Sequence, residues 1–186
     1  MGKRSDYIRK EKDFYETPLK AVQPLIPHLP RDGFLLIDPC AGEGKIGDHV
    51  RDLMPDAQIP YLPFEMYDDE YEMDVMQADA TTCQYGTSDE LTLFITNPPW
   101  SREILHPIID NLSWQEPTWL LFDADWMHTN QASQYLRYCK KIVSVGRVKW
   151  IEGSKGVGKD NCAWYLFDRT DSSPIQEITK TIFVGK

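Results

Sequence analysis

The feature that most constrains the fold is a set of short, fully apolar runs separated by segments with helical spacing. Such runs stand at 33–38 (GFLLID), 91–96 (LTLFIT) and 117–125 (PTWLLFDAD). They lack the alternation of a strand with one wet face, so they are typical of buried strands. Segments 43–54 and 101–112 between them space their apolar residues as helices do. This alternation predicts an α/β fold with a parallel sheet covered on both faces.

The remaining segments show weaker patterns. Segment 16–30 predicts a first helix with Thr17 as its N-cap and Pro18 in the first helical position, and Pro24 predicts a kink or an early end. Pro63 weakens a second strand, which we expect at 59–65. We further expect a short polar helix or loop at 67–76, a helix at 130–140 and a strand or extended edge within 175–185.

Two further strands are expected at 141–151 and 161–168. Only the polar loop EGSKGVGKD at 152–160 separates them. This loop is too short for a crossover helix, so the two strands should pair antiparallel. The chain is therefore expected to form a Rossmann-like, doubly wound, mostly parallel sheet that ends in an antiparallel hairpin. No linker divides the sequence, and we expect a single domain over 1–186.

Several motifs invite a functional interpretation that their context weakens. The hairpin loop nearly matches a phosphate-binding P-loop, but Asp160 stands where Ser or Thr is needed and a strand follows instead of a helix. Asp123 and Asp125 form a lone DxD pair, for which a capping or loop role is favoured. The four histidines have no catalytic spacing. Trp150 in the hairpin could serve the core or stack on a base.

Composition limits the function classes. The four cysteines form no CxxC pair and have no histidine at ligand spacing, so we expect no metal site and free thiols in a reducing compartment. No apolar run approaches the roughly 20 residues that span a bilayer. Segment 1–18 lacks the apolar core of a secretory signal. A cytoplasmic protein without membrane contact is expected.

Charge is unevenly distributed along the chain. The net charge of −9 by itself argues against a nucleic-acid binder. However, residues 61–90 hold nine acids and no Lys or Arg, whereas residues 137–159 hold seven basic residues and one acid. A molecule with one acidic and one basic face is as well supported by this pattern as ordinary solvated charge.

The first apolar run leads directly into DPCAGEGKIG at 38–47. Gly42 and Gly44 permit a tight turn and the close approach of a ligand, and the N-terminus of the following helix is electropositive. Asp38 would repel a pyrophosphate but suits a ligand with a positive charge or an amino group. The spacing is GxG, not the dinucleotide pattern GxGxxG, so we expect a nucleotide-type pocket of another kind.

Two more acids follow at expected strand ends. Glu65 lies 21 residues after Gly44, near the spacing at which an acid accepts hydrogen bonds from ribose hydroxyls. Asp79 stands where a third strand would end. Either acid alone could be a cap or a solvated loop residue, but acids at three successive strand ends are harder to explain in that way. Only 13 residues separate Glu65 from Asp79, which is too few for a full crossover helix. The sequence therefore does not decide whether a third strand exists.

The run at 91–96 ends in NPPW. Prolines cannot donate to a sheet, so they end the strand and fix the loop. The side-chain carbonyl of Asn97 and the backbone carbonyl of Pro98 are then two acceptors in fixed positions. Together they could hold both hydrogens of one NH2 group and direct its lone pair out of plane, as attack on a methyl group requires. Trp100 could stack on the ring that bears the amine; a proline turn with a core tryptophan is the alternative.

Taken together, DPCAGEG and NPPW resemble S-adenosylmethionine-dependent amino methyltransferases, especially the adenine-N6 DNA methyltransferases. DFYETP resembles the cofactor-binding segment of the subgroup in which the cofactor motif comes first. GRVKWIEGSKG and CAWYLF resemble the hairpin that helps to hold the target base. The resemblance covers most of residues 14–168 and implies the class I methyltransferase fold. The compact form, in which we expect no separate target-recognition domain, resembles stand-alone enzymes of phages and mobile elements.

The resemblance also implies roles for individual residues. Glu65 would bind the ribose of S-adenosyl-L-methionine and Asp79 its adenine amino group. The implied catalytic residues are Asn97, Pro98, Pro99 and Trp100. The implied substrate-binding residues are Trp100, Arg147, Lys149, Lys155 and Lys159. The implied cofactor-binding residues are Tyr15, Thr17, Pro18, Asp38, Pro39, Cys40, Ala41, Gly42, Gly44, Glu65, Asp79 and Asn97.

The function implied is methyl transfer to the N6 amine of adenine, with DNA favoured over RNA as the partner. The adenine would be single-stranded or flipped out of its duplex, and a second copy or a partner protein could supply specificity. RNA adenine and a protein glutamine side chain are alternative substrates for the same chemistry. A different class stays open as well: a non-catalytic binding or inhibitor protein on the same fold, suggested by the acidic residues 61–90.

Overall fold

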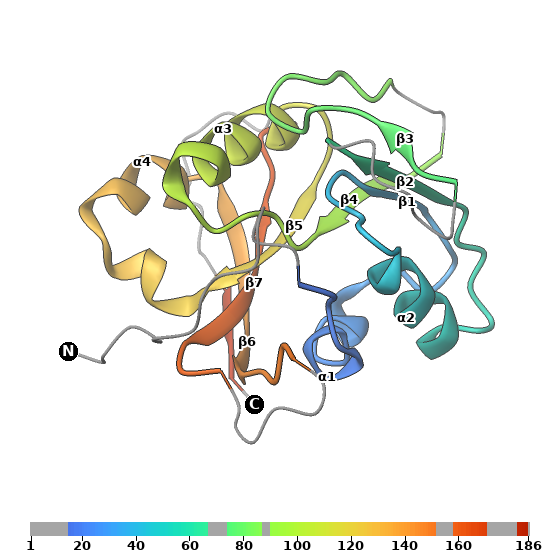
Figure 1. Cartoon of the computed structure of the whole chain (residues 1–186), viewed down its shortest axis with the longest axis horizontal. Helices are drawn as coiled ribbons and strands as arrows, with labels where there is room; N and C mark the ends of the chain where they lie inside the picture. The colour runs from blue at the N-terminus through green and yellow to red at the C-terminus, as the bar shows by residue number, and fades with distance from the viewer. Residues whose placement is uncertain (1–14, 67–73, 87–89, 152–157, 171–181, 186) are drawn as a thin grey trace.

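The computed structural model describes residues 15–66, 74–86, 90–151, 158–170 and 182–185. These residues form an eight-stranded sheet in the order β3-β2-β1-β4-β5-β7-β6-β8 (Figure 1). The strands are β1 (Leu35–Asp38), β2 (Tyr61–Glu65), β3 (Met76–Gln77), β4 (Thr92–Thr96), β5 (Thr118–Asp123), β6 (Cys139–Arg147), β7 (Asn161–Phe167) and β8 (Ile182–Val184).

Strands β1 to β5 run parallel, which confirms the expected mostly parallel sheet. Strand β7 is antiparallel to both β5 and β6, so β6 and β7 form the expected terminal hairpin. The tail adds β8, which pairs parallel with β6. Because the parallel strands share one direction, the carboxyl ends of β1, β2, β4 and β5 meet at the same edge of the sheet, where such folds bind ligands.

Helices cover both faces of the sheet (Figure 1). Helices α1 (Leu19–Val22) and α2 (Lys45–Leu53) pack on one face, and α3 (Arg102–Ser113) and α4 (Ser133–Leu136) on the other. Adjacent strand residues alternate between the two cores: Leu36 faces α1 and α2, whereas Ile37 faces α3. Burial on both sides explains the fully apolar runs in the sequence. The doubly wound architecture is thereby confirmed.

The first helix differs from the expectation. Helix α1 has only four residues, and a separate 3-10 turn (Ile26–His28) follows it, so Pro24 marks an early end. Pro18 occupies the N-cap position and no side chain caps the helix. The predicted capping role of Thr17 is therefore wrong, because its hydroxyl is engaged elsewhere.

Segment 130–140 is also less helical than predicted. It contains a 3-10 turn (Asn130–Ala132) and the four-residue α4, and β6 already begins at Cys139. The backbone N–H of Tyr138 donates to the Tyr135 carbonyl at 2.9 Å, which closes the last turn. Aromatic residues near this end are mediocre helix formers and pack well in sheets, so tertiary packing decides in favour of the strand.

The third strand exists, but it is only two residues long. Phe64 and Glu65 of β2 pair with Met76 and Gln77 of β3. Pro63 precedes the first of these pairs, so its missing N–H costs no bond between β2 and β3. The acid pair at the end of β5 has the predicted capping role, since Asp123 accepts from the Asp125 N–H at 2.9 Å.

Candidate active site

The glycine turn, residues 38–44, connects β1 to α2 at the carboxyl edge of the sheet. Gly42 and Gly44 have φ angles of 52° and 72°, in the left-handed region that favours glycine. The Ala41 N–H donates to the Phe64 carbonyl, and the Gly44 N–H to the Ala41 carbonyl, both at 2.9 Å. The turn is thus tied to β2 and closed on itself. Pro39 is buried within it.

Asp38 ends β1 with a fully buried side chain. Its Oδ1 accepts from the Cys40 N–H at 3.3 Å, whereas Oδ2 is buried without a hydrogen-bond partner among the described residues. Burial raises the pKa of Asp38 to about 7, although hydrogen bonds from Thr96 and Cys40 act in the opposite direction. An acceptor left unsatisfied is costly, so this position suits a cationic or amino ligand that would donate to Oδ2.

Glu65 lies beside the turn at the end of β2. Its Oε2 accepts from the Gly42 N–H at 3.2 Å and its Oε1 from the Met66 N–H at 2.8 Å. Asp79 follows β3 by two residues, and its Oδ1 accepts from the N–H and the hydroxyl of Thr81 at 2.9 Å and 2.7 Å. Both acids therefore stand at strand ends on the edge that carries the glycine turn.

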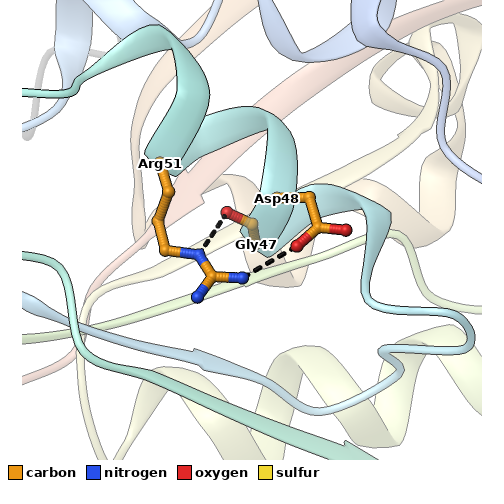
Figure 2. Close-up of polar contacts among 3 residues, drawn as sticks. All are labelled: Gly47, Asp48 and Arg51. Carbon is orange, nitrogen blue, oxygen red and sulfur yellow. Dashed lines mark hydrogen bonds and ion pairs between the residues drawn. The ribbon is translucent and has the colours of Figure 1, made fainter. Parts of the chain in front are cut away.

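Helix α2 is fitted closely to the sheet behind the turn. A Cβ atom on Gly47 would lie 2.5 Å from the Tyr61 ring, so only glycine leaves room for that ring. Figure 2 shows Arg51 on the same helix, donating to the Gly47 carbonyl at 3.3 Å and to Asp48 at 2.8 Å. The Arg51 guanidinium also lies 5.3 Å from the centre of the Tyr61 ring. This packing fixes the helix whose N-terminus completes the turn.

The polar lip, residues 97–100, follows β4, which is the neighbour of β1 in the sheet. The last residue of β4, Thr96, is fully buried, and its Oγ1 accepts from the Cys40 N–H at 3.1 Å. This bond joins the glycine turn directly to the strand end that carries the lip. Pro98 is buried, and Asn97, Pro99 and Trp100 are half-buried.

Asn97 has two side-chain partners. Its Nδ2 donates to Thr17 Oγ1 at 3.1 Å, and its Oδ1 accepts from the indole N–H of Trp100 at 3.2 Å. Thr17 belongs to the segment 15–18, which directly precedes α1. The structure therefore brings the N-terminal segment to the lip through Asn97.

The hairpin approaches the lip through an aromatic contact. The Trp150 ring meets the Trp100 ring edge-on, with centroids 5.7 Å apart and an interplanar angle of 84°. Arg147, Lys149 and Lys159 are exposed on the same hairpin, while Lys155 lies outside the described residues. Arg147 ends β6 at the carboxyl edge of the parallel strands, so these cations stand on the side of the candidate site.

The structure thus brings together Asp38, the glycine turn, Glu65, Thr17 and the lip. Sequence reasoning missed Thr96, whose position directly before Asn97 at the strand end was the available signal. It also missed Tyr61, whose buried hydroxyl has no partner among the described residues. Burial raises the pKa of Tyr61, and so does the nearby Asp38. Trp150, for which the sequence allowed a core or a base-stacking role, is partly buried against the hydrophobic core and also contacts the lip.

The site fits S-adenosyl-L-methionine on these observations. The unsatisfied Asp38 Oδ2 could accept from the amino group of its methionine part. The left-handed glycines leave backbone that a ligand can approach closely, and the Glu65 carboxylate could accept from ribose hydroxyls.

The described residues contain no cluster of three metal-ligating side chains. No helix among them has the length and apolar character needed to cross a bilayer.

Solved structures share this architecture. A Pyrococcus horikoshii protein proposed to be an RNA methyltransferase has a TM-score of 0.58 at 14% identity, covering 89% of this chain and 91% of its own. A Listeria monocytogenes protein proposed to be a class I S-adenosylmethionine-dependent methyltransferase has a TM-score of 0.59 at 10% identity, covering 96% and 68%. The fold is that of the class I methyltransferases.

This methyltransferase fold also occurs in a larger protein. The methyltransferase subunit of a type I restriction-modification system from Streptococcus thermophilus has a TM-score of 0.60 at 10% identity, with 92% of this chain covered. The chain spans about half of that subunit, 47% of its length. No model of a protein family and no curated protein matches the sequence.

Proposed function

We propose that this chain transfers a methyl group from S-adenosyl-L-methionine to the exocyclic N6 of adenine in DNA. One observation carries the proposal: the hydrogen bond of 3.1 Å between Cys40 and Thr96 joins the glycine turn to the lip that bears Asn97. A methyl donor in the turn and an amine on the lip would face one another across a short gap. The restriction-modification subunit among the similar folds supports a nucleic-acid substrate.

S-adenosyl-L-methionine would supply a methyl group on a positively charged sulfur, already activated for transfer. Asp38 would accept hydrogen bonds from its amino end, Glu65 from its ribose and Asp79 from its adenine amino group. Asn97 would contact it from the lip. The remaining residues of its proposed site are Tyr15, Thr17, Pro18, Pro39, Cys40, Ala41, Gly42 and Gly44.

The contribution of the lip is to hold the target amine. Asn97 Oδ1 and the Pro98 carbonyl would each accept one hydrogen of the NH2 group, and Pro99 would keep the loop rigid. The nitrogen lone pair would then be directed at the methyl group. As the new N–C bond forms, the bond between the methyl group and the sulfur would break, and one N–H proton would pass to water. Positioning supplies most of the rate in such a reaction, so no general base with a shifted pKa is needed.

Base and backbone recognition would fall to the hairpin side of the lip. Trp100 would stack on the adenine, which would be single-stranded or flipped out of a duplex. The exposed Arg147, Lys149 and Lys159, with Lys155, would contact phosphates. This local cluster answers the objection raised by the net charge of −9, because a basic patch can bind nucleic acid on an acidic molecule.

The test is incubation with labelled S-adenosyl-L-methionine and separate pools of DNA, RNA and protein, followed by nucleoside analysis. We expect N6-methyladenine in DNA. Asn97→Ala should lower the rate about a hundredfold, as does loss of one preorganised polar group in other enzymes, with the cofactor Kd changed by less than about threefold. Asn130→Ala, at an exposed asparagine that is not among the proposed site residues, is the control and should be unaffected.

Other outcomes identify the alternatives. Label in RNA would keep the chemistry and change the partner, and label on protein glutamine would refute the nucleic-acid assignment. Calorimetry without detectable binding at millimolar S-adenosyl-L-methionine would favour a non-catalytic binding protein on this fold.

A further inference from the structure

The Asn97 side chain is held at both ends by hydrogen bonds to other side chains. Nδ2 donates to Thr17 Oγ1 at 3.1 Å across 80 positions of sequence, and Oδ1 accepts from Trp100 Nε1 at 3.2 Å. If the carboxamide turned over, the Thr17 hydroxyl could still donate to its oxygen, but the NH2 group would meet the indole N–H of Trp100 and that bond would be lost. The contact with Trp100 therefore selects the orientation, and the bond to Thr17 holds the other end of the side chain.

The chemistry of the two partners determines which end of the carboxamide faces which way. An indole N–H is a donor only, so the atom that faces Trp100 must be the oxygen of Asn97. The NH2 group then faces the Thr17 hydroxyl, which can accept. A carbonyl oxygen has two lone pairs and Trp100 uses one, so the second can accept from a target amine.

The position of Thr17 is fixed by the packing of its segment against the core. The residue is only 5% exposed. Helix α1 begins two residues later, and its Ala21 carbonyl accepts from the Trp164 indole N–H of β7 in a buried bond of 2.8 Å. Ala21 and Val22 are fully buried against the sheet. The segment that carries Thr17 is therefore fixed to the core.

Trp100 is anchored from the opposite side. Its ring packs against Trp150. The Gly158 N–H donates to the Val148 carbonyl at 2.7 Å, which closes the hairpin behind Trp150, and a Cβ on Gly158 would lie 2.9 Å from that carbonyl and 3.3 Å from the Trp150 ring. This tight packing holds the ring pair in place and keeps the Trp100 N–H directed at Asn97.

We propose that Thr17 and the indole N–H of Trp100 are positioning residues that orient Asn97 for the target amine. The inference rests on the proposed methyl transfer and adds to it. Thr17 acts through Asn97, and Trp100 acts through its N–H as well as through its ring face. Phenylalanine at position 100 would stack without orienting Asn97. Tyrosine would not select the oxygen, because its hydroxyl both donates and accepts.

Three variants isolate these roles. Thr17→Val removes the acceptor and keeps the shape, Thr17→Ser keeps the hydroxyl, and Trp100→Phe keeps an aromatic ring. The matched control is Thr118→Val: Thr118 is also fully buried, and its hydroxyl donates to the Glu116 carbonyl at 2.8 Å at the start of β5, away from the carboxyl edge.

We expect Thr17→Val and Trp100→Phe each to lower kcat about tenfold, because a misoriented acceptor loses its bond to the amine in the transition state. The KM for nucleic acid and the Kd for S-adenosyl-L-methionine should change by less than about threefold. Thr17→Ser should restore kcat to within about threefold of the wild type, and Thr118→Val should leave kcat unchanged.

A second readout needs neither cofactor nor substrate. In 1H–15N spectra, Thr17→Val should shift the Asn97 side-chain amide and the Trp100 indole signals, and Thr118→Val should shift neither. Unchanged kcat and unchanged signals in Thr17→Val would overturn the proposal. So would a tenfold weaker cofactor Kd with unchanged kcat, since Thr17 would then serve the cofactor alone and would not act through Asn97. A wild-type protein inactive on every substrate pool would defeat the proposed function instead, and the spectra would still decide the orientation of Asn97.

Discussion

Cys40 in the glycine turn and Thr96 at the end of β4 are joined by a hydrogen bond of 3.1 Å from the Cys40 backbone N–H to the Thr96 hydroxyl. The same N–H reaches Asp38 Oδ1 at 3.3 Å. Strand β1 carries the glycine turn and β4 carries Asn97, so this contact sets the spacing between the two halves of the candidate site. The spacing is therefore set by a contact within the protein itself.

Thr96→Val tests the importance of this link. Valine keeps the volume but removes the acceptor, so we expect the free energy of unfolding to fall by about 1–2 kcal/mol and the methyl-transfer rate to fall severalfold. Urea denaturation and initial rates measure the two effects. Thr96→Ser keeps the hydroxyl and should retain most of both quantities. Equal losses in the two variants would show that packing, not the hydrogen bond, is what matters.

The ionised form of Asp38 should destabilise the folded protein. Burial raises its folded-state pKa from 3.8 to about 7, so the protonated form favours folding, and stability falls as the pH rises through the interval between these values. Asp38→Asn removes this titration but buries an amide NH2, so we expect a net gain of about 1–2 kcal/mol at pH 8. The gain should shrink towards pH 5. Urea denaturation at both pH values measures it, and a gain independent of pH would contradict the assignment.

The same carboxyl should make cofactor binding depend on pH. An amino group with a positive charge prefers the ionised carboxylate, and the pKa of Asp38 in the free protein is about 7. The Kd for S-adenosyl-L-methionine should therefore rise as the pH falls below 7, approaching tenfold per pH unit. Calorimetry between pH 5.5 and 8 checks this dependence. In Asp38→Asn the cofactor should bind weakly, and its Kd should lose this pH dependence.

The sequence predicted the parts of the fold that depend on local pattern. The runs at 33–38, 91–96 and 117–125 became β1, β4 and β5, because strands buried on both faces are apolar at every position. The sequence could not decide whether β3 exists, because a strand of two residues, Met76–Gln77, is too short to show a hydrophobic periodicity. The length of the helix expected at 130–140 was overestimated, because β6 already begins at Cys139.

The candidate site shows the same division. The positive φ angles of Gly42 and Gly44 agree with the GxG pattern, and strand ends carry the acids where the alternation placed them. The contacts of Asn97 were beyond reach, since Thr17 lies 80 positions away and matches an N-cap pattern equally well. The pairing of Trp150 with Trp100 depends on hairpin geometry that no short motif encodes.

Gly47→Ala should destabilise the protein although alanine is the better helix former. The substitution gains about 1 kcal/mol in helix propensity, but the new Cβ would lie 2.5 Å from the Tyr61 ring, an overlap that costs about 1–3 kcal/mol or more. Tyr61→Leu removes the ring, so the double variant should be more stable than the sum of the single effects predicts. Thermal denaturation of the four proteins measures this coupling, and strict additivity would refute the packing argument.

The exposed hairpin cations should govern nucleic-acid affinity. Changing Arg147, Lys149 or Lys159 to glutamine should weaken DNA binding without altering base preference, because phosphate contacts carry no sequence information. Each loss should reduce the slope of log K against log salt by about 0.7–1. Arg137→Gln is the control: Arg137 lies before the start of β6, at the opposite edge of the sheet, with its guanidinium 4.7 Å from the Tyr138 ring centre. An equal loss of affinity in the control would mean that net charge, not the hairpin, attracts DNA.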